Sequence, residues 1–225
     1  MRKIFIAGID EAGRGPILGP LVIAGVLANK EQEEMLIEMG VKDSKELKPA
    51  TRKKLAEKIK KTVEAYSIIK ITASELNELM PRKSLNEIEA MKTAQILDEL
   101  KPKPDIAIVD APDIVEENYA KRIRKYLCAS VVIKSEHFAD SKYPIVGAAS
   151  ILAKVERDAE IDELKKEFGN IGSGYWHDED TKNFVEAYIK SYNKLPPFAR
   201  IYWEPSVRML NEKRQKKLLD FTSSE

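Results

Sequence analysis

An apolar run from Ile4 to Ile9 constrains the fold most, because two carboxylates and a glycine-rich turn follow it directly. A second apolar run, Leu21–Ala28, begins where this turn ends. The connection is too short for the crossover helix that a parallel pair needs, so we predict that the two runs are antiparallel neighbours in one sheet.

Strand patterns alternate with helical patterns along the rest of the chain. The predicted strands are Ile4–Ile9, Leu21–Ala28, Ser67–Ile71, Asp105–Val109 and Ala129–Ile133. Because helical segments separate the later strands, these can be parallel to the first one, and the sheet is then mixed. The sequence predicts an α/β fold in which helices flank a mixed β-sheet.

The helical segments carry their own start and stop signals. Pro49 suits the first turn of a helix, and an apolar stripe continues that helix as far as Tyr66. Ser84 and Glu87 form a capping box that opens a helix reaching Leu100. Later helices are predicted up to Phe168 and over Phe184–Tyr192 and Val207–Leu219, the last two forming a small C-terminal helical unit.

Four carboxylates follow the predicted strands. Asp10 and Glu11 follow the first strand, Asp110 follows the fourth and Asp140 comes soon after the fifth. Neighbouring strands lie about 4.8 Å apart, so side chains at their ends can converge. Converging carboxylates repel one another unless a cation lies between them, and such hard oxygen ligands favour magnesium or manganese over zinc. Two ions about 4 Å apart would suit phosphodiester hydrolysis, while a solvated acidic turn is the alternative.

Composition limits the class of protein. The 225 residues suffice for one α/β domain with a small appendage, and the net charge is +1, so contacts with nucleic acid would have to be local basic patches. The single cysteine, Cys128, excludes an internal disulfide and suits the cytosol. Because the sequence shows no signal peptide or long apolar span, we expect a cytoplasmic protein that does not contact membranes. We also expect a monomer.

Six motifs follow one another in a specific order. They are Gly8–Pro16 with Gly19-Pro20, Asp43-Ser44-Lys45 with Leu47, Val109-Asp110, Ala139-Asp140 with Lys142-Tyr143-Pro144, Ala148–Val155 with Arg157-Asp158, and Gly172–Tyr175. Together they closely resemble the motifs of type 2 ribonuclease H, or ribonuclease HII, especially its archaeal form. The chain departs from the family pattern at Trp176-His177-Asp178 and over Tyr202–Pro205, in the C-terminal region.

The resemblance implies a ribonuclease H-like fold and a metal-dependent endonuclease. Such an enzyme cleaves the RNA strand of RNA/DNA hybrids and incises duplex DNA 5′ to single embedded ribonucleotides. The resemblance makes four residues the catalytic acids that bind two Mg²⁺ or Mn²⁺ ions: Asp10, Glu11, Asp110 and Asp140. The residues expected to contact the substrate are Gly13, Arg14, Gly15, Lys45 and Tyr175.

The expected domains are a catalytic domain over 1–172 and a C-terminal helical domain over 173–225. Two other classes of protein stay open from the residues alone. A phosphotransferase or ATPase of related topology would need further glycine-rich phosphate loops after the later strands. A non-catalytic nucleic-acid-binding module would have no use for four convergent acids.

The C-terminal tail resembles the peptide by which replication and repair enzymes dock on the sliding clamp. It has Gln215, an aliphatic Leu218 three positions later and Phe221 three after that. Side chains spaced by three eclipse in a 3₁₀ turn, so Leu218 and Phe221 would form one apolar plug. Thr222 stands where a second aromatic residue is usual, and a plain helix end is the alternative.

Overall fold

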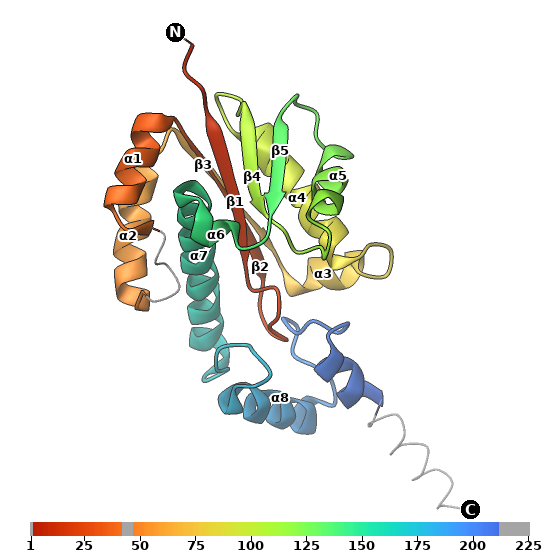
Figure 1. The fold of residues 1–225 in the computed structure, drawn as a ribbon. Coiled ribbons are helices and arrows are strands. Elements are labelled where there is room, and N and C mark those ends of the chain that lie inside the picture. The colour runs from red at the N-terminus through yellow and green to blue at the C-terminus, as the bar shows by residue number, and fades with distance from the viewer. Residues whose placement is uncertain (1, 42–46, 212–225) are drawn as a thin grey trace, which may run out of the picture. The chain divides into compact units, whose positions relative to one another are not determined.

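Five strands form one sheet in the computed structural model of the chain, which describes residues 2–41 and 47–211 (Figure 1). The strands are β1 (Ile6–Ala12), β2 (Leu21–Ala28), β3 (Ala65–Ile71), β4 (Ile106–Asp110) and β5 (Val132–Glu136). Their order across the sheet is β3-β2-β1-β4-β5, with β1 at the centre.

The pairing of β1 confirms the predicted mixed sheet. β1 is antiparallel to β2 and parallel to β4, and β4 is parallel to β5. Ile9 pairs with Gly25 on one side and with Val109 on the other. Because β1 and β4 run in the same direction and in register, the next residues, Asp10 and Asp110, follow at the same edge of the sheet.

Helices cover both faces of the sheet (Figure 1). In chain order, the helices of the described residues include α1 (Lys30–Glu38), α2 (Pro49–Thr62), α3 (Ala73–Leu79), α4 (Leu85–Glu99), α5 (Glu116–Arg124), α6 (Ala139–Lys142), α7 (Pro144–Phe168) and α8 (Glu179–Tyr192). On one face, α1, α2 and the first part of α7 share a core with Val22 and Ala24 of β2. On the other face, Ile96 of α4 lies against Gly25, so successive residues of β2 meet different helices.

Gly8 allows α7 to approach β1 closely. A Cβ atom at Gly8 would lie 2.4 Å from the carbonyl carbon of Ile145, in the first turn of α7. Asp10 faces the same side of the sheet because it lies two residues further along the strand. The close approach therefore brings the first turns of α7 beside Asp10.

A second compact unit consists of Gly15–Pro20, Ile71–Arg82 and the chain from Glu160 onward. Its core is made of Ile17, Leu18, Ile161, Ile171, Val185 and Ala199. The helical residues 204–211 belong to this unit. Arg200 is fully buried in it and donates from Nε to the carbonyl oxygen of Gly19 at 2.9 Å. The division into domains at residues 172 and 173 remains a prediction.

Tyr66 does not continue α2, contrary to the prediction, and the last strand is Val132–Glu136, later than the predicted Ala129–Ile133. That helix ends at Thr62, because Val63 adopts extended backbone angles, and Tyr66 lies in β3 with 44% of its surface exposed. Within residues 2–41 and 47–211, no helix is both long enough and apolar enough to cross a membrane. The cytoplasmic location and the monomeric state remain predictions.

Candidate active site

Asp10 lies near the end of β1, on the face covered by α7, and is only 6% exposed. Its Oδ1 atom accepts a hydrogen bond from the amide of Glu11 at 2.8 Å, and the Ser150 hydroxyl of α7 favours its charged form. Burial raises the pKa of Asp10 well above its ordinary value, and the charges of Glu11 and Asp110 raise this pKa further. Asp10 is therefore a buried carboxylate with acidic neighbours.

Asp110 ends β4 and is linked to the helix that carries Asp140. Its Oδ1 atom accepts a hydrogen bond of 2.7 Å from the amide of Ala139, the first residue of α6. Asp140 is the next residue and is 6% exposed. This hydrogen bond holds the Asp110 side chain beside the backbone of the segment that supplies Asp140.

Glu11 points to the opposite face of the sheet, toward α4, because side chains alternate along a strand. Removal of its carboxylate from water is the main cause that raises its pKa to about 8. The negative charges of Glu89 and Asp110 raise this pKa further, while the positive charge of Arg14 opposes them. The adjacent acids of β1 thus meet different surroundings.

The surroundings of the first three acids, Asp10, Glu11 and Asp110, fit a hard divalent cation. The charges of Glu11 and Asp110 raise the pKa of Asp10, and the charge of Asp110 also raises the pKa of Glu11. A positive ion between these carboxylates would relieve their repulsion. Among the residues that the structure describes, no three His, Cys, Asp or Glu side chains stand ready to share one ion. Asp10 and Asp110 each accept a backbone hydrogen bond through Oδ1.

The turn after β1 places Arg14 against α4. Gly13 has a φ of 84°, a left-handed conformation that favours glycine. The guanidinium of Arg14 forms an ion pair with Glu89 through Nη1 and donates to Oδ1 of Asn86 through Nη2. The residue expected to contact substrate is therefore held by two side chains of one helix.

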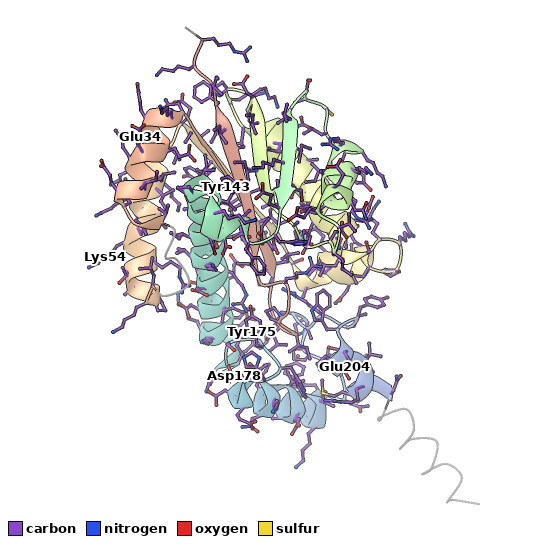
Figure 2. All side chains as sticks on the ribbon, in the orientation of Figure 1. Glu34, Lys54, Tyr143, Tyr175, Asp178 and Glu204 are labelled. Carbon is purple, nitrogen blue, oxygen red and sulfur yellow. The ribbon has the colours of Figure 1, made fainter. Side chains whose placement is uncertain are left out.

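Gly15 and Tyr175 meet within the second unit. A Cβ atom at Gly15 would lie 3.5 Å from Cε1 of the Tyr175 ring, so the glycine leaves the edge of the ring uncovered. Tyr175 and Asp178 come from the loop before α8 (Figure 2). Asp178 accepts from the amide of Ser173 at 2.6 Å, and the Gly174 carbonyl accepts from the amide of Ile17 at 2.8 Å. These hydrogen bonds hold the loop in place around Tyr175.

The remaining predicted site residues lie outside the described parts of the chain. They are Lys45, Gln215, Leu218 and Phe221. In turn, the sequence interpretation missed Glu89 and Asn86, which hold Arg14. A usable signal was present, because Glu89 is a charged residue within the apolar stripe of a predicted helix.

Comparison with known proteins identifies the family. The family model described as Ribonuclease HII matches residues 7–206. The ribonuclease HII of Thermococcus sibiricus is 43% identical over 220 residues, covering 96% of this chain and 97% of that protein. The chain belongs to the ribonuclease HII family. Family membership makes it a hydrolase of the endoribonuclease type and decides against the phosphotransferase and the non-catalytic binding module.

Solved structures from the ribonuclease HII family share the fold. The ribonuclease H2 of Pyrococcus horikoshii superimposes with a TM-score of 0.88 at 41% identity, covering 94% of this chain and 99% of that one. A complex of PCNA with the ribonuclease HII of Archaeoglobus fulgidus matches with a TM-score of 0.81 at 43% identity, covering 89% of this chain and 96% of that one. The ribonuclease H-like fold predicted from the motifs is confirmed.

Proposed function

We propose that this ribonuclease HII cleaves the RNA strand of RNA/DNA hybrids and incises duplex DNA 5′ to single ribonucleotides. The observation that carries the proposal is the group of carboxylates at the ends of two parallel strands, Asp10 with Glu11 on β1 and Asp110 on β4. Asp10 and Glu11 have raised pKa values, partly because of the negative charge of Asp110. Such a site suits a phosphodiester reaction that brings cations to a negatively charged substrate.

The proposed ligands of two Mg²⁺ or Mn²⁺ ions are Asp10, Glu11, Asp110 and Asp140. When bound, such ions generate a nucleophilic water at neutral pH and stabilise the leaving oxygen. The chain's own contribution is orientation of the acids. The Glu11 amide holds Asp10, whose charged form the Ser150 hydroxyl of α7 favours, and the Ala139 amide holds Asp110 from α6.

The proposed substrate contacts discriminate RNA from DNA. The 2′-hydroxyl distinguishes a ribonucleotide from a deoxyribonucleotide, so close contacts at the sugar are required. Gly13, Arg14 and Gly15 supply a backbone that a nucleic acid can approach and a guanidinium suited to phosphate. The Tyr175 ring is left open at Gly15, which suits stacking beneath a sugar. Lys45 would add a contact with phosphate.

Cleavage of two labelled duplexes tests the function directly. One is a continuous RNA/DNA hybrid, and the other is DNA with one ribonucleotide. We expect cleavage of both with Mg²⁺ or Mn²⁺, incision 5′ to the single ribonucleotide, and no cleavage in EDTA. Wild-type rates for Asp110→Asn with magnesium would contradict the assignment of the acids.

Tyr175→Ala tests recognition of the sugar. We expect it to slow cleavage of the single-ribonucleotide duplex more than cleavage of the continuous hybrid, because the hybrid offers other registers. Equal losses on both substrates would indicate that Tyr175 only packs within the second unit. The ratio of kcat/KM values on the two substrates is the measurement.

We also propose that the tail residues Gln215, Leu218 and Phe221 dock on a sliding clamp. The Archaeoglobus fulgidus relative that was solved as a complex with PCNA supports this proposal. Tethering to a clamp raises the local concentration of the enzyme at newly made DNA. Changing Leu218 and Phe221 to alanine should abolish clamp binding in calorimetry and leave cleavage of free hybrid unchanged. An intact protein without clamp affinity would contradict the proposal.

A further inference from the structure

Glu89 is a buried acid that the proposed chemistry does not itself require. It lies in α4 and is only 1% exposed. Its Oε2 atom forms the ion pair with Nη1 of Arg14, 75 residues away in the chain. Tyr119 of α5 shares these surroundings: burial raises its pKa, and the charges of Glu89 and Glu11 raise it further. Glu89 therefore connects the turn after β1 with the buried side of α4, which packs against the sheet.

Asn86 gives Arg14 a second support one turn earlier on α4. Its Oδ1 atom accepts from Nη2 of Arg14, and its Nδ2 atom donates to Oδ1 of Asp113. The Asp113 carboxylate also accepts a hydrogen bond of 2.9 Å from Nε of Arg122. Because both ends of the Asn86 amide have partners, its orientation is set by residues beyond Arg14.

These contacts set the direction of Arg14 more than they stabilise the fold. A buried ion pair contributes little net stability, because its attraction is offset by the cost of removing two charges from water. A guanidinium is planar, however, and acceptors at two of its nitrogens fix both its position and its plane. The side chain of Arg14 is about one-third exposed, at 34%, so the held group still reaches the surface.

We propose that Glu89 is a positioning residue, which holds the Arg14 guanidinium in the orientation that meets the substrate, with Asn86 as its second support. This inference rests on the proposed role of Arg14 in binding the ribose and phosphate near the cut. An arginine without these acceptors would sample many rotamers and would have to be ordered each time that substrate binds. Ordering one such side chain costs up to about a factor of ten in affinity.

A double-mutant cycle on the full chain tests the proposal. The variants are Glu89→Ala, Arg14→Ala and the pair together, with kcat/KM measured on a labelled RNA/DNA hybrid in magnesium. We expect Glu89→Ala to lower kcat/KM roughly tenfold and to have almost no further effect when Arg14 is already alanine. Glu89→Gln keeps an acceptor of the same length and should recover part of the loss. Glu99→Gln, the same change on the exposed side of α4, is the matched control and should have wild-type activity.

Several outcomes would overturn the proposal. If Glu89→Ala causes its full loss even in the Arg14→Ala background, Glu89 acts through Glu11 or through the fold and not through Arg14. Wild-type kcat/KM for both Glu89 variants would mean that Glu89 does not affect cleavage at all. Wild-type activity of Arg14→Ala would remove the substrate role on which the inference depends. Failure of the wild-type enzyme to cleave hybrid would instead contradict the proposed function. If Glu89→Ala does not fold, the same double-mutant cycle is measured with Glu89→Gln in its place.

Discussion

Asp10 and Glu11 are neighbours in sequence, yet they connect the site to different helices. Asp10 lies on the α7 face, where a backbone amide donates to its carboxylate and the Ser150 hydroxyl favours its charged form. Glu11 lies on the α4 face, where the charges of Glu89 and Arg14 act on it in opposite directions. The two-residue repeat of a strand causes this division. An acidic pair at a strand end is thus two different acids, and each depends on its own helix.

The largest expected effects come from removing either charge. Asp10→Asn and Glu11→Gln should each lower kcat on hybrid by at least about 100-fold, because each removes stabilisation of the transition state. The fold and hybrid binding should stay intact. If one variant kept near-wild-type kcat, the two acids would not act in the same reaction.

Two glycine substitutions compare the faces by packing. Gly8→Ala would force a Cβ atom to 2.4 Å from the backbone of Ile145, which cannot move without shifting α7. Gly25→Ala would instead meet the side chains of Ile96 and Ile9, which have more freedom to adjust. We expect Gly8→Ala to destabilise the protein by about 3 kcal/mol or more and Gly25→Ala by less. Denaturant unfolding measures both, and the reverse order would contradict the rigid contact on the α7 face.

The pH dependence of stability should report Glu11 in the metal-free protein. Its pKa of about 8 in the folded state lies above the ordinary 4.5, so the folded state binds this proton more tightly than the unfolded state. The contribution to the free energy of unfolding is therefore complete below pH 4.5 and is lost as the pH rises to about 8.

Glu11→Gln should weaken this pH dependence, and only in part, since Asp10 also has a raised pKa. Melting temperatures in EDTA between pH 4.5 and pH 8 measure the effect. An unchanged pH profile in Glu11→Gln would show that the carboxylate on the α4 face is not a buried acid in solution.

The smallest expected effect concerns the neutral partner of Asp10. Ser150→Ala removes a hydroxyl that favours the charged form of that carboxylate and that accepts from Nζ of Lys154 at 2.6 Å, which should cost about 1 kcal/mol and lower kcat/KM roughly fivefold. Ser67→Ala removes a serine hydroxyl that binds Glu99 on the surface and serves as the control. A loss as large as that of Asp10→Asn would mean that Ser150 does more than orient the acid.

Much of the fold could be predicted because its signals are local. The short turn between the first two apolar runs required an antiparallel pair, and the structure has it. The helix that begins after Ser84 ends at Glu99, one residue before the predicted Leu100. The end of α2 was missed, because an apolar residue at helical spacing, Tyr66, also fits the strand that follows.

The site was harder to predict, because its contacts join distant segments. Parallel strand ends made the meeting of Asp10 with Asp110 predictable. Sequence spacing could not indicate that Arg14 would be held by Glu89, since only the packing of α4 against the sheet brings them together. Likewise, Glu87 was expected to complete a capping box, and its carboxylate instead accepts from Arg122 and from Tyr126 at 2.7 Å.

The hydrogen bond from the Ala139 amide to Asp110 has a consequence for observing the enzyme at work. A backbone amide that is bonded to a carboxylate exchanges its hydrogen with solvent slowly, and exchange becomes faster when the carboxylate turns away. Ala139 is itself buried and need not touch the nucleic acid. The deuterium uptake of this one amide therefore reports the orientation of Asp110 in each state of the catalytic cycle, with no probe attached to the protein.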